Sequence, residues 1–253
     1  MSQEKSDALQ IRGDRVVLGD WSGDLGELIA KNIELRTLLR DGRKADARAL
    51  VQAQVAEEQA VLVAMDENPE EVLSLTAMDE RFKPGYRPAV VEKVPAEVLA
   101  EMVAPAGVKL VRFNSELLAA MPAETFARTV EDTLDPVYYH GNRTQVSWEW
   151  LEAVAALDDH NKRAELLFRV DQSMIEDALL DKTDSIDMHA EVWAGTQTVS
   201  AFRLLSESGQ AVMLPPIKDQ EIAETIHSLH EAAPELLSKV VRNAWERAGS
   251  LGQ

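Results

Sequence analysis

A glutamate and a histidine stand one helical turn apart near the end of the chain, at Glu224 and His227. Di-iron carboxylate bundles use this Glu-x-x-His spacing to place two metal ligands on one side of a helix, and His230 extends the row. A complete site of that type needs a second such pair, and the sequence contains none. A solvated polar helix face is therefore the favoured interpretation. A metal-dependent enzyme that uses Glu224, His227 and His230 is the weaker alternative.

Other residues with chemical potential have simpler explanations. Asp187, His189 and Glu191 would share one side of a strand and could bind zinc or manganese, but any half-exposed strand shows the same alternation. Asp158-Asp159-His160 is typical of the start of a helix, where an aspartate caps the first turn. The nucleophile elbow, the phosphate-binding loop and the dinucleotide-binding glycine motif are all missing. We therefore predict no catalytic residue.

Four aromatic residues gather within thirteen positions, namely Tyr138, Tyr139, Trp148 and Trp150. Tyrosine and tryptophan are favoured at the centres of protein interfaces, so these four are candidate partner-binding residues. Core packing is the favoured alternative, because large aromatic rings also dominate protein interiors. Trp148 and Trp150 would point to different sides of a helix, so we expect at most one of them to be buried.

The composition limits the class of protein. The 253 residues are 45% hydrophobic, which is ample for a buried core, and carry a formal net charge of −18. So acidic a chain is a poor ligand for nucleic acid, whose phosphates bind lysine and arginine. The chain has no cysteine, no signal-peptide-like apolar segment at its N-terminus and no apolar run of the length, about 18 residues, that crosses a membrane. A cytoplasmic protein without direct membrane insertion is expected.

The periodicity predicts a mostly helical fold in two parts. Residues 43–65 show apolar positions at helical spacing, which indicates one long amphipathic helix. Three helix starts then follow at separations of 26 and 27 residues, each with a proline and a glutamate two positions later: Pro69, Pro95 and Pro122. Proline is favoured in the first turn of a helix, and regular spacing of short helices is typical of stacked repeats. We predict an N-terminal extension and first helix at 1–42, a helical superhelix at 43–135, and a second mainly helical part at 136–253 that could include short strands.

The repeated Pro-x-Glu helices between Asn68 and about Leu134 resemble the cytoplasmic N-terminal helical domain of bacterial magnesium transporters and the related middle domain of flagellar motor switch proteins. The resemblance implies a right-handed superhelix of short helices. It implies no binding residue here, because the chain lacks the spanning helices of the transporters.

Charge is distributed unevenly along the chain. Residues 49–80 contain eight acidic residues and no basic one. Together with the predicted concave stack, this favours a non-enzymatic interaction or adaptor protein whose acidic helical surfaces bind a protein partner of basic or mixed charge. Self-association is compatible with such a stack. No cofactor is expected; the alternative is a regulatory module in which clustered carboxylates bind Mg²⁺ or another divalent cation.

Overall fold

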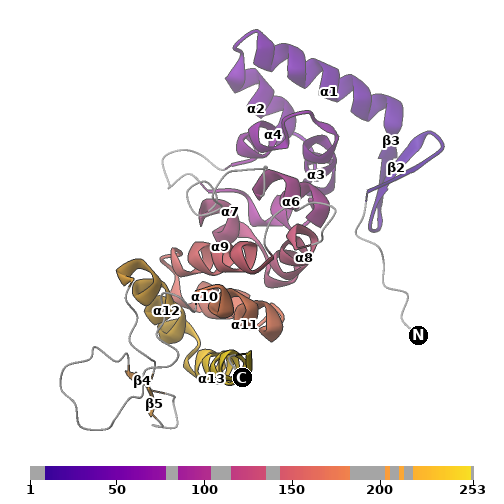
Figure 1. The fold of residues 1–253 in the computed structure, drawn as a ribbon. Coiled ribbons are helices and arrows are strands. Elements are labelled where there is room, and N and C mark those ends of the chain that lie inside the picture. The colour runs from indigo at the N-terminus through magenta and orange to yellow at the C-terminus, as the bar shows by residue number, and fades with distance from the viewer. Residues whose placement is uncertain are drawn as a thin grey trace. The chain divides into compact units, whose positions relative to one another are not determined.

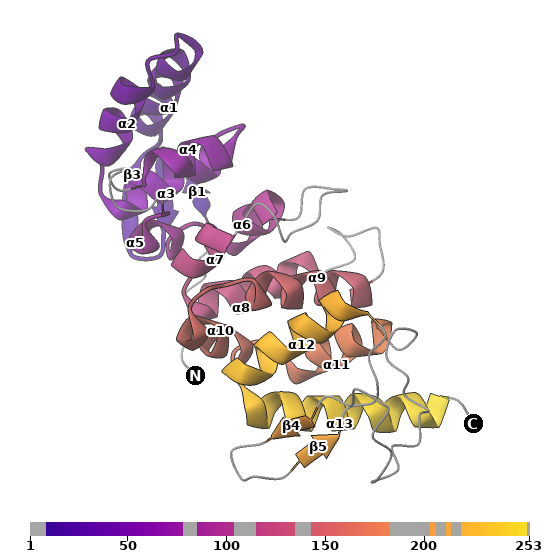
Figure 2. The same cartoon turned by 90° about the vertical axis from the view of Figure 1, so that its left-hand side faces the viewer.

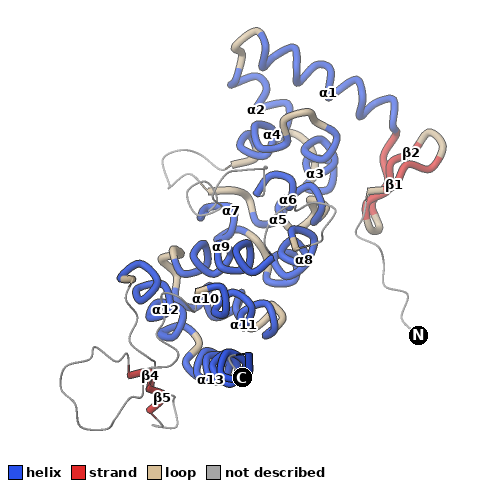
Figure 3. Tube along the Cα trace, viewed as in Figure 1, coloured by secondary structure: helices blue, strands red, loops and turns tan. Residues whose placement is uncertain are grey.

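The computed structural model describes residues 9–77, 85–103, 115–134, 143–182, 203–205, 211–213 and 219–251. These residues form thirteen helices and five short strands, so the prediction of a mostly helical fold with short strands is confirmed (Figures 1 and 3). Contacts divide the chain into two compact units. Unit 1 consists of residues 1–105 and 120–129, and unit 2 consists of residues 106–119 and 130–253.

A three-stranded antiparallel sheet opens unit 1. It contains β1 (Gln10–Arg12), β2 (Arg15–Leu18) and β3 (Trp21–Asp24), in that spatial order. Each connection is a two-residue Gly-Asp turn, and Gly13 and Gly19 have φ values of 65° and 58°. Glycine suits this position because hairpin turns of two residues require a positive φ there. The sheet was not predicted for residues 1–42, although Gly-Asp between alternating segments is a recognised hairpin signal.

The long helix predicted for residues 43–65 is wrong, because the structure contains two helices there. After α1 (Leu25–Arg40) come α2 (Lys44–Gln52) and α3 (Ala56–Met65), separated by an extended residue at Val55. The side chain of Gln59 donates a hydrogen bond of 2.8 Å to the carbonyl oxygen of Gln54 and so stabilises the break. The break gives α3 its own direction, and five consecutive residues of α3, Gln59 to Val63, are buried.

The three predicted proline-led helix starts are confirmed. Helix α4 (Pro69–Leu75) begins at Pro69, while α6 (Ala96–Val103) and α8 (Ala123–Thr133) begin directly after Pro95 and Pro122. Two shorter helices, α5 (Pro88–Val91) and α7 (Ser115–Ala120), lie between them in the sequence. Within unit 1, α3 contacts α4 and α5, and α4 contacts α2 and α6. A superhelical repeat built from these helices stays a prediction.

Unit 2 is built around α9 (Arg143–Ala155), which contacts α10 (His160–Leu167), α11 (Gln172–Asp181) and α12 (Gln220–Ala232). Helix α13 (Pro234–Leu251) packs against α11 and α12, and Figure 2 shows α13 below these two helices. The strands β4 (Arg203–Leu205) and β5 (Ala211–Met213) pair antiparallel. They supply the short strands that were expected in the second part of the chain.

The chain passes between the two units three times, near residues 105, 119 and 129. The predicted boundary between residues 135 and 136 lies outside the described residues, in the gap between 134 and 143. Helices α7 and α8 are each divided between the units.

Candidate partner-binding surface

Helix α1 is held in place from its first turn. The carboxylate of Asp24 caps the helix by accepting a hydrogen bond of 2.8 Å from the backbone N–H of Glu27. Such a cap satisfies one of the amides that a helix start leaves without a partner. Leu28, Leu35 and Leu38 are buried and define the inner side of the helix.

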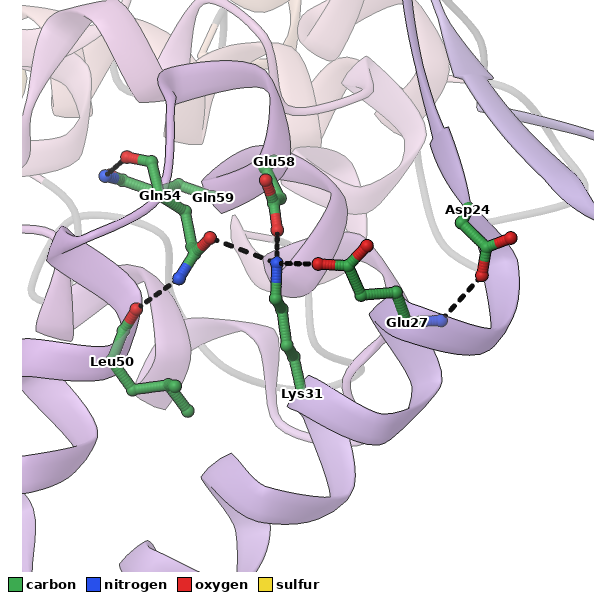
Figure 4. Close-up of polar contacts among 7 residues, drawn as sticks. All are labelled: Asp24, Glu27, Lys31, Leu50, Gln54, Glu58 and Gln59. Atoms are coloured by element: carbon green, nitrogen blue, oxygen red, sulfur yellow. Dashed lines mark hydrogen bonds and ion pairs between the residues drawn. The ribbon is translucent and has the colours of Figure 1, made fainter.

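A lysine on the inner side of α1 joins the helix to α3. The ammonium group of Lys31 makes an ion pair of 2.9 Å with Glu27, a second ion pair with Glu58, and donates a hydrogen bond of 3.2 Å to the side chain of Gln54 (Figure 4). The carboxylates of Glu58 and Glu27 raise the pKa of Lys31 above its ordinary value of 10.5, and this outweighs the opposing effect of partial burial. Lys31 is therefore charged at neutral pH, and its positive charge is used within the unit.

A second polar contact lies one to two turns further along α1. Arg36 forms ion pairs with Asp66 and, at 3.2 Å, with Glu71 at the start of α4. Asn32 donates a hydrogen bond of 3.0 Å to the same Asp66 carboxylate, which is fully buried. A buried carboxylate is tolerated only when charges and hydrogen bonds compensate it, so these contacts fix the orientation of α1 about its own axis.

The outer side of α1 exposes aliphatic side chains. Ile29 and Ile33, one helical turn apart, are 43% and 62% exposed. The other exposed residues of the same helical row are Gly26, Ala30 and Thr37, with the cationic Arg40 at the end of the helix. Since 3.6 residues make one turn, this row lies roughly opposite the buried Leu28 and Leu35. We call Gly26, Ile29, Ala30, Ile33 and Thr37 the outer stripe.

Three acidic residues border the outer stripe. Glu27, Glu34 and Asp41 are exposed and follow one another at intervals of seven residues, which is about two helical turns. Residues at this spacing stay on one side of a helix and flank an apolar seam in helix pairs. The arrangement can therefore bind an apolar helix surface along the outer stripe and attract positive charge along its acidic edge.

This surface was not predicted from the sequence. The leucines of this helix form one apolar row, which is enough to face the core. Ile29 and Ile33 form a second apolar row, and this second row was the feature of the sequence that could have indicated an exposed apolar surface. Their exposure depends on which row of α1 faces α3 and α4. The buried leucines and the polar contacts of Lys31 and Arg36 together fix this row, and those polar contacts join residues more than 20 positions apart.

The predicted aromatic candidates lie elsewhere. Tyr138 and Tyr139 fall outside the described residues. Trp148 and Trp150 are both buried in unit 2, so the expectation that at most one of them is buried is wrong. Helix α9 is covered by several helices, which gives both faces a packing partner. A role of these residues in partner binding stays a prediction.

Each tryptophan in α9 has a specific polar contact. The indole N–H of Trp150 donates a hydrogen bond of 2.8 Å to the hydroxyl of Thr133, and that of Trp148 donates one of 2.6 Å to Glu152. The ammonium of Lys182 lies 5.4 Å from the centroid of the Trp148 ring, within the range of a cation–π interaction.

The predicted metal residues all lie on α12 but in different environments. Glu224 is exposed and accepts a hydrogen bond from Gln220, and His227 pairs with Glu231 at 3.3 Å. His230 is buried. Among the described residues no three histidine, aspartate or glutamate side chains stand together as a metal site would require. Metal binding by this set stays a prediction, and Asp187, His189 and Glu191 lie outside the described residues.

Comparisons with protein-family models, curated proteins and solved structures found no match to the chain. The resemblance to transporter and motor-switch domains consequently stays a prediction. None of the helices in the described ranges is both long enough and apolar enough to cross a membrane.

Proposed function

We propose that the chain is a protein-interaction module whose outer stripe binds an amphipathic helix of a protein partner. The partner helix would carry aliphatic side chains opposite Ile29 and Ile33 and lysine or arginine along the edge that meets Glu27, Glu34 and Asp41. The observation that carries this proposal is the pair of exposed isoleucines beside an acidic edge at heptad spacing. It retains the non-enzymatic adaptor role and the basic or mixed partner that the sequence favoured.

The apolar part of the outer stripe would supply most of the affinity. Complete burial of an isoleucine side chain contributes about 1.5–3 kcal/mol, so covering Ile29 and Ile33 is a substantial gain for a binding reaction. Gly26 and Ala30 have little or no side chain and would allow a partner backbone to approach closely. The ion pairs on the inner side of α1 hold the stripe in one orientation, which reduces the entropy that binding would otherwise cost.

The acidic edge would supply selectivity for a basic partner. Charges at the rim of an interface mainly speed association and disfavour partners of like charge. The net charge of −18 acts in the same direction over longer distances, so a partner helix with an acidic edge would be repelled.

The test uses a designed peptide, because it requires no knowledge of the natural partner. The probe is a fluorescent amphipathic helix of leucine on one side and lysine along the edge, and its binding is measured by anisotropy. Replacing both isoleucines (Ile29→Ser with Ile33→Ser) should weaken binding by at least about tenfold. Glu34→Gln should weaken it less and reduce its dependence on salt. Val55→Ser is the matched control, because Val55 is an exposed aliphatic residue outside α1.

Three results would contradict the proposal. Equal binding by the double serine variant and by the unaltered protein would show that the outer stripe is not the docking surface. Equal binding of a second peptide with glutamate in place of lysine would show that the acidic edge selects nothing. The protein could also dimerise, and the double serine variant could abolish that dimerisation. The surface would then bind a second copy of the chain, and the proposal of a helix from another protein would be wrong.

A further inference from the structure

Unit 1 contains a cavity of about 460 Å³. Four separate stretches of the chain line it: the β2–β3 turn, the start of α3, the connection between α5 and α6, and the start of α8. The volume falls in the range of small-molecule sites, about 300–1,000 Å³. None of the interactions assigned to the outer stripe of α1 uses these residues.

A cation and a carboxylate in the lining of this cavity face each other at a distance too long for a direct hydrogen bond. The ammonium nitrogen of Lys93 and a carboxylate oxygen of Glu57 are 4.0 Å apart, and the two side chains are 41% and 32% exposed. A direct charge-assisted hydrogen bond would bring such atoms to about 2.7–2.9 Å. The ammonium of Lys93 and the carboxylate of Glu57 can therefore each form a hydrogen bond with a group of a bound ligand. A zwitterion fits this arrangement, because its carboxylate can accept from Lys93 while its ammonium donates to Glu57.

An aromatic side chain in the lining is positioned by a glycine. A Cβ atom on Gly23 would lie only 2.4 Å from the indole of Trp21, so the ring occupies space that any other residue at position 23 would fill. The indole is thus held against the sheet at the wall of the cavity. Tryptophan is the best of the aromatic side chains at attracting organic cations to its face.

The remaining charges of the lining are mainly negative. Glu92 joins Glu57, and the other charged residues of the lining are Asp20, Glu124 and Arg128, which also interact with groups of the chain itself. These carboxylates are spread over the wall, and the described residues hold no group of three acids or histidines that would suit a metal ion. A ligand that matches this lining carries one negative group and an excess of positive charge on an organic frame.

We infer that this cavity binds a free basic α-amino acid. The α-carboxylate contacts Lys93, the α-ammonium contacts Glu57, and the side-chain cation lies near Glu92 and the Trp21 indole. The contact with both Lys93 and Glu57 makes the amino acid a better ligand than a simple amine. This inference is independent of the proposed helix-binding function.

The experiment is isothermal titration of the full chain with L-arginine, with agmatine, which lacks only the carboxylate, and with L-glutamate. L-arginine should bind, agmatine should bind at least about tenfold more weakly, and L-glutamate should show no binding. Lys93→Gln should remove the difference between L-arginine and agmatine, because that difference depends on the carboxylate contact. Lys162→Gln is the control and should leave all three titrations unchanged, because Lys162 lies on α10 in unit 2.

Gly23→Ala provides a second variant that changes no charge. It should weaken L-arginine and agmatine alike, because it displaces the indole and leaves Lys93 and Glu57 intact. Circular dichroism of each variant shows whether it folds. The inference would be overturned by the absence of L-arginine binding to the unaltered protein, by equal affinity for agmatine, or by a Lys93→Gln variant that still distinguishes the two ligands.

Discussion

At the scale of single residues, His230 is a buried titratable group. It lies on α12, and its Nε2 atom has no hydrogen-bond partner within the described part of the chain. Burial lowers the pKa of His230 below the ordinary value of 6.5; the nearby His227 lowers it further, and Glu231 partly opposes both. The native protein therefore favours the neutral imidazole.

This environment predicts a loss of stability in mild acid. Above about pH 6.5 the imidazole is neutral in both the folded and the unfolded chain, so the full free energy of unfolding is present. As the pH falls below that value, the unfolded chain takes up a proton that the native state resists, and the free energy of unfolding decreases. Urea unfolding at about pH 7.5 and pH 5.5 should show a smaller decrease for His230→Gln than for the unaltered protein.

Gln220→Ala serves as the control for this comparison, because Gln220 is an exposed residue on the same helix and does not titrate. It should show the same pH-dependent decrease as the unaltered protein. An equal decrease in His230→Gln would mean that other groups cause the acid sensitivity.

At the scale of secondary-structure elements, α1 is attached to unit 1 by polar contacts as well as by leucines. Lys31 and Arg36 each bridge acidic residues on α1 or on the helices beside it. Partly buried ion pairs of this kind add orientation more than stability, since desolvation offsets much of the attraction. Removal of one partner is nonetheless costly because the other charge remains.

Replacement of Lys31 by methionine should therefore destabilise the protein and loosen α1. Methionine retains much of the apolar stem but leaves the largely buried Glu58 carboxylate without this cation. We expect the free energy of unfolding to fall by about 1–2 kcal/mol in urea titrations. In this variant the backbone amides of α1 should exchange hydrogen faster than in the unaltered protein, whereas exchange in unit 2 should change less.

A matched variant distinguishes the loss of the Lys31 ion pairs from the general effect of replacing a lysine by methionine. Lys162 pairs with Glu165 at 3.2 Å within α10, where the carboxylate is exposed. Lys162→Met should change the free energy of unfolding by less than about 0.5 kcal/mol. Similar losses in the two variants would show that the Lys31 contacts contribute nothing specific to the docking of α1.

At the scale of the whole molecule, the excess of negative charge should dominate the response to salt. The chain has 44 acidic and 26 basic residues, and like charges repel one another throughout the folded state. Raising NaCl from about 20 mM to about 300 mM shortens the range of this repulsion severalfold, while partly buried pairs such as that of Lys31 are screened less. The melting temperature should therefore rise with salt.

Calorimetric scans across this salt range would test the prediction. A variant that carries Glu67→Gln, Glu101→Gln and Glu131→Gln removes three exposed acidic groups and should show a smaller rise. A melting temperature that falls as salt increases would mean that attractive ion pairs outweigh the repulsion in this protein.

Several features of the protein were determined by short stretches of sequence alone. The helix starts at Pro69, Pro95 and Pro122 were predicted because proline and an early glutamate favour the first turn whatever surrounds it. Asp159 was likewise predicted as a helix cap, and it accepts hydrogen bonds from the backbone N–H groups of Asn161 and Lys162. The turns at Gly13 and Gly19 were equally local and could have been recognised.

Other features were decided only by the tertiary structure. The helix break at Val55, the burial of both Trp148 and Trp150, and the exposure of Ile29 depend on which helices pack on each side. Helical periodicity gives each residue a direction relative to its own helix but says nothing about the neighbours it meets. Contacts between residues far apart in the sequence, such as Lys31 with Glu58, contribute to which apolar row is covered and which is left exposed.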